Sequence, residues 1–346
     1  YTFDDVQIVP QYSDIYSRSN CDISNSRLTK SYTIDIPLVS APMDTVTGVD
    51  MALELLDLGG AGFVHRFMSS IEQADCIVPL VDSVRYKGYD KNSTPICGTI
   101  GVTGDYIKRA RVLLSIGANV LLLDVAHGHH ELVKEALFNL TNLKEEFDFE
   151  VIAGNVCTWE GTQDLIEWGA DGIRVGVGNG SMCSTRIQTG VGLPSISSIK
   201  ECVEVGNDYN VPIMADGGIR SPGDVCKALG AGASTVMIGS LLSGTKESPG
   251  QITKVGSWPN EVLQKKYRGS ASIESKKDRG ENKNVEGVSR YVLYKGKTKR
   301  IIEDICDGLR SSMSYVGAKD LEEFRKKCKF VTVTNAGMVE ARPHGL

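Results

Sequence analysis

The stretch "PIMADGGIRSPGDVCKALGAGASTVMIGS", from Pro212 to Ser240, decides the fold class of this chain. It contains two short apolar runs, 212–220 and 235–240, and each run passes into glycine and polar residues. A helical stretch lies between them. Near-continuous apolar runs are typical of parallel strands that are covered by helices on one face and packed on the other. The stretch therefore predicts a strand, a helix and a second, parallel strand.

The same pattern occurs eight times along the chain. The eight apolar runs are 36–44, 61–67, 94–102, 120–128, 150–156, 172–180, 212–220 and 235–240. Amphipathic segments lie between them. In the segment 129–147, one helical face would collect Leu132, Val133, Ala136, Leu137, Leu140 and Leu143. Eight such units predict an α/β chain with a (β/α)8 TIM barrel rather than an open doubly wound sheet.

Polar residues and glycines gather at the C-terminal ends of the predicted strands. They are Met43-Asp44, His65-Arg66, Asp124 to His130, Asn155, Gly176 to Cys183, Asp216 to Gly218 and Gly239-Ser240. These ends share one face of a barrel, and active sites form on that face. The sequence therefore predicts one site at this end.

Two segments lie outside the plain barrel. The first ~35 residues are expected to form an irregular entry segment. Residues 245–297 form a long excursion after the eighth strand, and the section 274–290 has nine charged residues in seventeen. That section is either a disordered solvated loop or a mobile flap that closes over a site. Because a helical pattern resumes at 299–317, we expect residues 1–346 to form a single barrel domain.

Composition excludes several classes of protein. The net charge of −5 argues against nucleic-acid binding as the main role. No apolar run reaches the ~18 residues of a membrane helix, and no signal peptide is recognised. The nine cysteines contain no C-x-x-C pair, which favours neither a zinc site nor a disulfide framework. We expect a cytoplasmic protein.

The loop "GVGNGSMCSTR", Gly176 to Arg186, presents one cysteine, Cys183, after three alternating glycines. Such glycines let the backbone approach a ligand. A stabilised thiolate there could act as a nucleophile. The alternative is a buried apolar cysteine. The G-x-G-x-G spacing is not a dinucleotide fingerprint.

The strand ends "MADGGIR" and "MIGS" suggest a nucleotide phosphate site. Asp216 could hold a ribose hydroxyl pair, and the glycines at the ends of the last two predicted strands could offer amides to phosphate. Simple turns are the alternative for each motif alone. The three histidines of "DVAHGHH" (124–130) are more easily explained as a ligand-contacting loop than as a metal site. His65 is expected to be a core or rim histidine.

These motifs resemble the IMP dehydrogenase/GMP reductase family along nearly the whole chain. The matching pieces, in order, are "FDDVQIVP", "PLVSAPMDTVT", "DVAHGH", "AGNV", "ADGIRVGVGNGSMCSTR", "MADGGIRSPGDVCKALGAGASTVMIGS" and "SYVGA". The resemblance implies a (β/α)8 barrel, usually a homotetramer, that acts on a purine mononucleotide. Fewer than thirty residues separate the second and third runs, so the regulatory CBS insert of many dehydrogenases is missing there.

The resemblance also implies roles for individual residues. Cys183 would add to C2 of the purine, with Thr185 and Glu286 as catalytic partners. Substrate binding would fall to Ser181, Asp216, Gly218, Gly239, Ser240, Tyr267, Gly269 and Ser270. The positions near the nicotinamide cofactor are Asp124, Asn155 and Arg174. The backbone of Gly176, Gly178 and Cys183 would hold a monovalent cation, K⁺.

The two branches of the family differ after the covalent purine adduct. The reductase expels ammonia from GMP and takes hydride from NADPH, using a threonine two residues after the cysteine with a flap glutamate. The dehydrogenase passes hydride from IMP to NAD⁺ and hydrolyses the adduct to XMP, using an Arg-Tyr pair on the flap.

The flap residues favour the reductase branch. Glu286 falls where the reductase glutamate is expected, and Gly280 follows Arg279 where the dehydrogenase would carry tyrosine. We therefore expect an NADPH-dependent GMP reductase. The alternative is an IMP dehydrogenase without a CBS domain, which "VSAPMDTVT" (39–47) and the C-terminal tail resemble. A deoxy or modified purine substrate, NADH in place of NADPH, and a nucleotide-binding protein without catalysis stay open.

Overall fold

The computed structural model describes residues 1–90, 93–257, 259–280 and 285–341. Eight parallel strands form its main sheet: β4 (Leu38–Ser40), β5 (Ala61–Gly62), β6 (Cys97–Ile100), β7 (Val120–Asp124), β8 (Glu150–Val156), β9 (Gly172–Val175), β10 (Ile213–Asp216) and β11 (Thr235–Ile238). The order of pairing is β5-β4-β11-β10-β9-β8-β7-β6, and a bridge from Val64 to Gly98 joins the two ends. Each predicted run contains one of these strands, so the predicted (β/α)8 barrel is confirmed.

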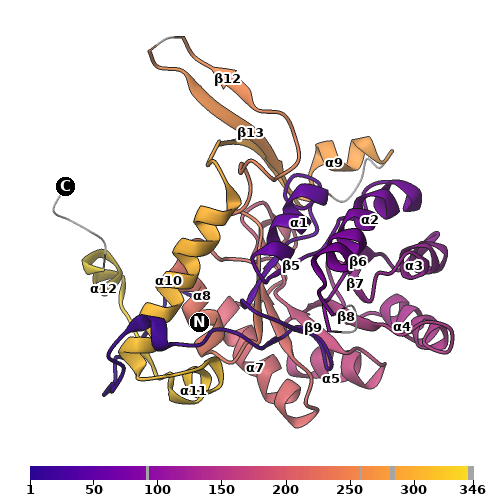
Figure 1. Ribbon diagram of the computed structural model, residues 1–346. Coiled ribbons are helices and arrows are strands. Elements are labelled where there is room, and N and C mark those ends of the chain that lie inside the picture. Colours follow the sequence, from indigo (N-terminus) through magenta and orange to yellow (C-terminus); the bar gives the residue numbers. More distant parts are fainter. Residues whose placement is uncertain (91–92, 258, 281–284, 342–346) are drawn as a thin grey trace.

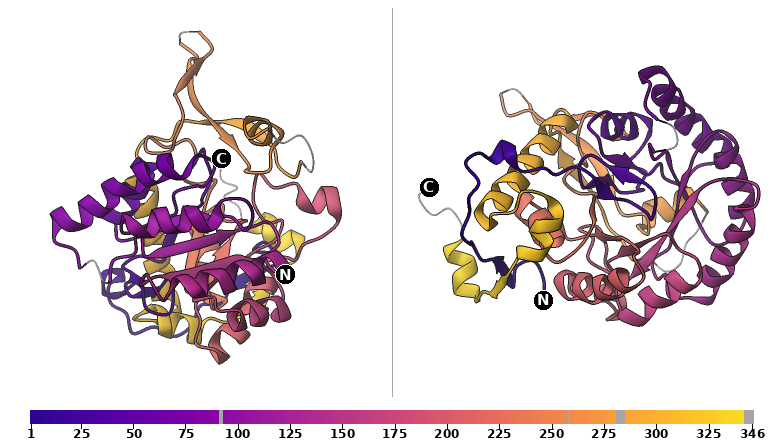
Figure 2. Two further views of the ribbon diagram at one scale, coloured as in Figure 1. Left: turned by 90° about the vertical axis from the view of Figure 1, so that its right-hand side faces the viewer. Right: turned by 60° about the horizontal axis from the view of Figure 1, so that its bottom comes forward.

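A helix follows each barrel strand, and the helices surround the strands (Figures 1 and 2). The helices are α1 (Val49–Asp57), α2 (Ser70–Lys87), α3 (Tyr106–Ser115), α4 (Glu131–Leu143), α5 (Trp159–Glu167), α7 (Ser195–Asp208), α8 (Pro222–Gly230) and α10 (Thr298–Val316). Helix α4 buries the predicted apolar face, except that Leu132 is 41% exposed because it lies in the first turn, beside the rim. That one assignment was wrong.

Strand β7 explains why the predicted strands read as continuous apolar runs. Val120 and Leu122 pack inside the barrel, in the cluster that contains Phe63. Leu121 and Leu123 pack in the larger cluster between strands and helices. Side chains alternate across a strand. Both faces of β7 are therefore buried, as in other parallel sheets.

The first residues are more ordered than the predicted irregular entry segment. A hairpin of β2 (Ser26–Arg27) and β3 (Thr33–Ile34) carries Leu28 and Tyr32, and both side chains join the barrel-interior cluster. Strand β1 (Val6–Ile8) pairs with β15 (Phe330–Thr332) near the C-terminal end of the chain. The remaining helices are η1 (Arg18–Asn20), α6 (Thr185–Thr189), α9 (Ile273–Asp278), α11 (Leu321–Lys327) and α12 (Asn335–Glu340).

The excursion predicted at 245–297 is folded where the structure describes it. It contains a three-stranded antiparallel sheet of β12 (Thr253–Val255), β13 (Val262–Arg268) and β14 (Ser289–Leu293). Helix α9 lies between β13 and β14 in the chain. The β12–β13 hairpin projects away from the barrel (Figure 1). The buried ammonium of Lys265 donates to the carbonyls of Thr245 and Ser248 and fixes the base of this sheet. Residues 281–284 of the predicted flap lie outside the described residues, and its mobility stays a prediction.

Within the described residues, no helix combines the length and the apolar character that crossing a membrane would require.

Candidate active site

A cavity of about 470 Å³ lies over the C-terminal ends of the barrel strands. Its walls combine the loops after the strands with residues from the described stretches 267–279 and 286–287. All the predicted site residues line it: Asp124, Asn155, Arg174, Gly176, Gly178, Ser181, Cys183, Thr185, Asp216, Gly218, Gly239, Ser240, Tyr267, Gly269, Ser270 and Glu286. The structure thus brings together residues at the ends of five strands, β7 to β11, and residues of the excursion after β11.

The loop between β9 and α6 presents Cys183 to this cavity. Gly176, the first residue after β9, has a φ of +143°. A Cβ at this position would lie 2.0 Å from the carbonyl oxygen of Asp216. Only glycine combines this backbone conformation with so close an approach to β10. The loop therefore crosses directly over the end of the neighbouring strand.

Cys183 differs from the other eight cysteines in its exposure. All nine cysteines are free, and Cys183 alone is exposed. Burial raises the pKa of the Cys202 thiol to about 12 and that of Cys306 to about 11. A raised pKa lowers the thiolate fraction and with it the reactivity. The alternative of a buried apolar cysteine, left open for Cys183 by the sequence, is wrong.

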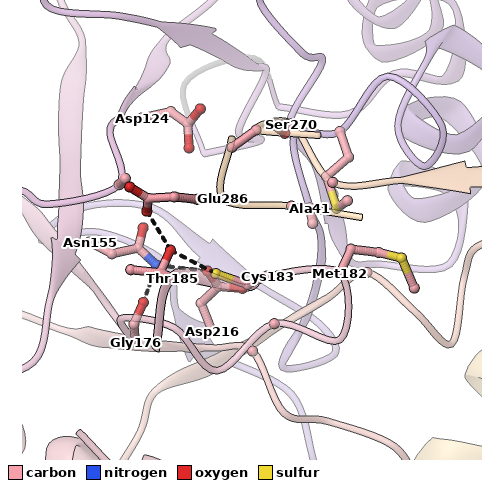
Figure 3. Close-up of a pocket in the computed structure, with 18 of the residues that line it drawn as sticks. Ala41, Asp124, Asn155, Gly176, Met182, Cys183, Thr185, Asp216, Ser270 and Glu286 are labelled. Carbon is pink, nitrogen blue, oxygen red and sulfur yellow. Dashed lines mark hydrogen bonds between the residues drawn. The ribbon is translucent and has the colours of Figure 1, made fainter. Parts of the chain in front are cut away.

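Cys183, Thr185 and Glu286 form a hydrogen-bonded series (Figure 3). The Cys183 thiol donates to Thr185 Oγ1 at 3.1 Å. The Thr185 hydroxyl donates to Glu286 Oε2 at 2.7 Å. Because each donor points toward the next acceptor, the series can carry a proton from the thiol toward the carboxylate.

Backbone hydrogen bonds hold Glu286 beside the cysteine loop. The Ser184 amide donates to the Glu286 carbonyl at 2.9 Å, and the Val288 amide donates to the Met182 carbonyl at 2.9 Å. The Glu286 amide donates to Ala271 at 3.1 Å. The position of the Glu286 carboxylate therefore depends on the Ala271 turn as well as on the cysteine loop.

A buried ion network lies on the barrel side of the cavity. Arg174 Nη1 donates to Asp124 Oδ1 at 2.6 Å, and its Nε donates to Asp216 Oδ2 at 3.0 Å. Burial alone would lower the pKa of Arg174, but the charges of Asp216 and Asp124 outweigh it and raise the pKa. Asn155 Nδ2 donates to Asp216 Oδ2 at 2.8 Å and to the Gly176 carbonyl at 2.7 Å. The network ties four strands, β7 to β10, to the cysteine loop.

Small residues and hydroxyls surround the end of the cavity beside β10 and β11. Ser181 Oγ and Tyr267 Oη lie 3.2 Å apart. Gly239 leaves room beside the Tyr267 hydroxyl, since a Cβ there would lie 3.4 Å from it. Burial raises the pKa of Tyr267, so its hydroxyl stays a donor. Such donors suit an anionic group such as a phosphate.

The histidine loop has other partners than a metal. His129 Nε2 lies 2.8 Å from Asp164 Oδ2, and His130 accepts from the Leu132 amide as the N-cap of α4. Among the described residues, no three His, Cys, Asp or Glu side chains gather closely enough to hold a metal ion. His65 is a buried rim histidine, as expected, and accepts from the Phe67 amide at 3.2 Å.

Sequence reasoning missed two features of the site. Phe67 lines the cavity beside Arg66 and Arg279, although it ends an apolar run that reads like a strand. The strand ends earlier, at Gly62. Arg186 folds back over the cysteine loop and donates to the carbonyls of Val177 and Leu193. No motif or periodicity in the sequence around Arg186 predicts these hydrogen bonds.

The chain is similar to known proteins along its whole length. The family profile of the "IMP dehydrogenase / GMP reductase domain" matches residues 1–344. An inosine-5'-monophosphate dehydrogenase of Cryptosporidium parvum is 38% identical, over 99% of this chain and 94% of that protein. One of Nitrosopumilus maritimus is 33% identical, over 99% and 98%.

A solved structure is also similar. The crystal structure of the C318A variant of GMP reductase from Trypanosoma brucei, in complex with guanosine 5'-monophosphate, matches with a TM-score of 0.89. The two sequences are 28% identical, and the match covers 100% of this chain and 98% of the other. With a profile that spans nearly the whole chain and relatives above 30% identity, the chain belongs to the IMP dehydrogenase/GMP reductase family of purine-nucleotide oxidoreductases.

Proposed function

We propose that this protein is a GMP reductase, which converts GMP and NADPH to IMP, ammonia and NADP⁺. The observation that carries the proposal is the series Cys183–Thr185–Glu286, at 3.1 and 2.7 Å. A reaction that expels an amino group needs a proton donor beside the carbon under attack. In this proposal, Glu286 and Thr185 supply it.

The reaction starts with the thiol. Cys183 Sγ would form a bond to C2 of GMP as the C2–N3 double bond gives its π electron pair to N3, and the thiol proton would pass through Thr185 to Glu286. The same pair then protonates the amino group at C2, the C2–N bond breaks, and ammonia leaves. A bound NADPH would supply the hydride that C2 then takes up. The C2–S bond would then break as the C2–N3 double bond re-forms, IMP would leave, and Cys183 would take a proton from solvent.

The chain's own residues would bind the nucleotide at both ends. Ser181, Tyr267 and the glycines at the ends of β10 and β11 would hold the phosphate. The hydrogen bonds on Asp216 use Oδ2, and we expect Oδ1 to accept from the ribose. Arg66, Lys276 and Arg279 line the same cavity. Their cationic side chains fit the phosphates of a nicotinamide dinucleotide, beside Asp124, Asn155 and Arg174.

IMP dehydrogenase is the second candidate. Arg279 lines the cavity, and both dehydrogenases compared above are more than 30% identical to this chain. In that reaction, hydride passes from C2 of IMP to NAD⁺, and water then hydrolyses the Cys183 adduct to XMP. Arg279 would activate the water. Gly280 replaces the tyrosine expected beside that arginine, which is why we place this reaction second.

Two parallel assays separate the candidates. One contains GMP and NADPH, the other IMP, NAD⁺ and KCl, and nicotinamide absorbance is followed in both. Loss of absorbance with release of ammonia in the first assay supports the reductase. A gain in the second assay alone overturns it in favour of the dehydrogenase. Purine binding without turnover in either assay, for every nucleotide tried, would favour a protein that has lost catalysis.

We also propose a K⁺ site at the carbonyls of Gly176, Gly178 and Cys183, and a homotetramer. The Gly176 carbonyl already accepts from Asn155, which fixes its direction. Replacing KCl with the chloride of a larger organic cation should lower turnover if the K⁺ site exists. Light scattering gives the number of subunits.

A further inference from the structure

The flap, of which the structure describes residues 267–280 and 285–287, contacts the mouth of the barrel at two places. Its Gly287 forms a backbone β-bridge with Cys183, on the loop after β9. Its Arg279 lies over the ring of Phe67, on the loop after β5. In the closed eight-stranded order, β5 and β9 are four strands apart in either direction. The two contacts therefore lie on opposite sides of the mouth.

Phe67 is in contact with two guanidinium groups. The Cζ of Arg279 lies 4.6 Å from the ring centroid, and the Cζ of Arg66 lies 5.1 Å from it. Both are within the distance at which a cation is attracted to an aromatic face. The His65 ring stacks on Phe67 at 5.9 Å. Burial lowers the pKa of His65 to about 4, so its imidazole adds no third charge at neutral pH.

The barrel side of this contact is fixed. Arg66 Nη2 donates to the Asp124 carbonyl at 3.2 Å, and its Nε lies 3.4 Å from Asp124 Oδ2. Gly101 leaves space for the guanidinium, since a Cβ there would lie 3.2 Å from Arg66 Nη1. Arg66, one of the two guanidinium groups over the Phe67 ring, is thus held in place by the barrel.

On the flap, hydrogen bonds connect Arg279 to Glu286. Arg279 Nη2 donates to the Ser270 carbonyl at 3.0 Å, and Nη1 donates to Ser275 Oγ at 2.8 Å. The next residue, Ala271, accepts from the Glu286 amide. Contacts therefore run without a gap from Phe67 through Arg279 and the 270–271 turn to Glu286, and from Glu286 to Thr185 and Cys183.

We propose that Phe67 is a positioning residue, onto which Arg279 docks to close the flap and set Glu286 against Thr185. It touches no reacting atom in this role and acts through Arg279. The proposal deepens the proposed function, since Glu286 acts in that reaction, but flap closure itself can be measured without turnover.

A second contact limits the expected effect. Arg268 pairs with Asp44 of the barrel and with Asp278 at the end of α9, each at 2.6 Å. Loss of the Phe67 contact should therefore raise the population of open flap without detaching the segment. A cation–aromatic contact of this kind corresponds to about a threefold to tenfold change in that population.

Limited trypsin digestion of the full chain tests closure directly, with cleavage after Lys276 and Lys277 followed by mass spectrometry. The rate of such cleavage tracks the open population when opening is fast. Phe67→Leu, which removes the aromatic face, should raise the rate about threefold to tenfold. Phe67→Tyr, which keeps it, should restore the wild-type rate. An unchanged rate in Phe67→Leu overturns the proposal.

Two further variants guard against a merely structural effect. Phe330, on β15, has a comparable aromatic ring whose centroid lies 6.0 Å from Lys200 Nζ. Phe330→Leu removes this ring and should leave flap cleavage unchanged. If Phe67→Leu does not fold, Arg279→Lys keeps the charge but not the planar group and should raise cleavage in the same way. Equal protection in Arg279→Lys also overturns the proposal.

Turnover separates this inference from the proposed function. In whichever of the two assays is active, Phe67→Leu should lower kcat, with little change in the KM for the nucleotide, and Phe67→Tyr should recover it. If neither assay shows turnover, the proposed function fails while the digestion result still decides the role of Phe67. A rise in the nucleotide KM with unchanged kcat would assign Phe67 to binding and overturn its positioning role.

Discussion

The two sides of the cavity are held in different ways. On the barrel side, Arg174 is 9% exposed in its side chain and pairs with Asp124 and Asp216, which are 15% and 18% exposed. On the flap side, Asp278, which pairs with Arg268, is 63% exposed. Buried pairs break at great cost, whereas exposed pairs contribute little. Changes on the barrel side should therefore affect folding and binding, and changes on the flap should affect turnover.

The largest effect is expected at Cys183, where the two sides meet. Cys183→Ser should lower kcat by about ten-thousandfold or more, because the hydroxyl is a much weaker nucleophile than a thiolate. Nucleotide affinity, measured by calorimetry, should change little. Cys76→Ser, on the outer helix α2, is the matched control and should keep its activity. Turnover retained by the Cys183 variant would rule out the covalent mechanism.

Arg174→Met tests the barrel side. It leaves Asp124 and Asp216 without their shared partner and should lower the free energy of unfolding by about 3–5 kcal/mol. Denaturant unfolding followed by tryptophan fluorescence measures the change. Arg111→Met removes an exposed pair with Glu146 and should leave the midpoint unchanged. Similar midpoints for both variants would mean that the barrel network is no stronger than a surface pair.

Glu286→Gln tests the flap side. It removes the carboxylate that accepts from Thr185 and should lower kcat by about a hundredfold, with the unfolding midpoint unchanged. In single-turnover experiments on the reductase reaction, ammonia release should slow more than hydride transfer. Glu274→Gln, on α9, is the control because its partner is Lys266 and not Thr185. If Glu286→Gln lowered the unfolding midpoint and left kcat unchanged, Glu286 would act in stability and not in turnover, which contradicts the distinction drawn between the two sides.

His65 provides the smallest expected effect, on the barrel side. Burial lowers its pKa from the usual 6.5 to about 4, against the opposing charge of Asp44. The unfolded chain therefore binds a proton between pH 6.5 and 4 that the folded chain does not. Stability from this source is complete above pH 6.5 and should fall by about 2 kcal/mol between pH 6.5 and 5.

Unfolding midpoints at several pH values measure that slope. In His65→Gln, which keeps a polar group of similar size, the slope over this range should flatten. An identical slope in the variant would assign the acid sensitivity to other groups.

The fold followed from patterns that are local in the chain. Strand β7 reads as one apolar run because both of its faces are buried, and helix α8 begins where Ser221 and Pro222 form an N-cap and first turn. Leu132 escaped this reasoning because helical periodicity assigns a face but not the depth at which the first turn meets the rim. The β2–β3 hairpin escaped it because its strands are two residues long.

The candidate site was predictable in its members but not in its contacts. Every residue that the strand ends and the family motifs named for the site lines the cavity. The partner of Phe67 could not be named, because an aromatic residue at the end of an apolar run reads as part of a strand. The fold of the charged segment 274–280 was equally hidden, since its charges carry no apolar period.

By itself, the sequence determined the eight strand–helix units, the end of the barrel that holds the site, and the one cysteine on a glycine loop. Hydrogen-bond periodicity and burial act on neighbours in the chain and leave a readable pattern. The family resemblance already named Thr185 and Glu286 as catalytic partners, and the tertiary structure added their hydrogen bond across 101 residues. Only the tertiary structure decided that Arg279 lies on Phe67. Barrel closure sets β5 opposite β9 and leaves the flap to span them, and no local pattern encodes contacts made across that distance.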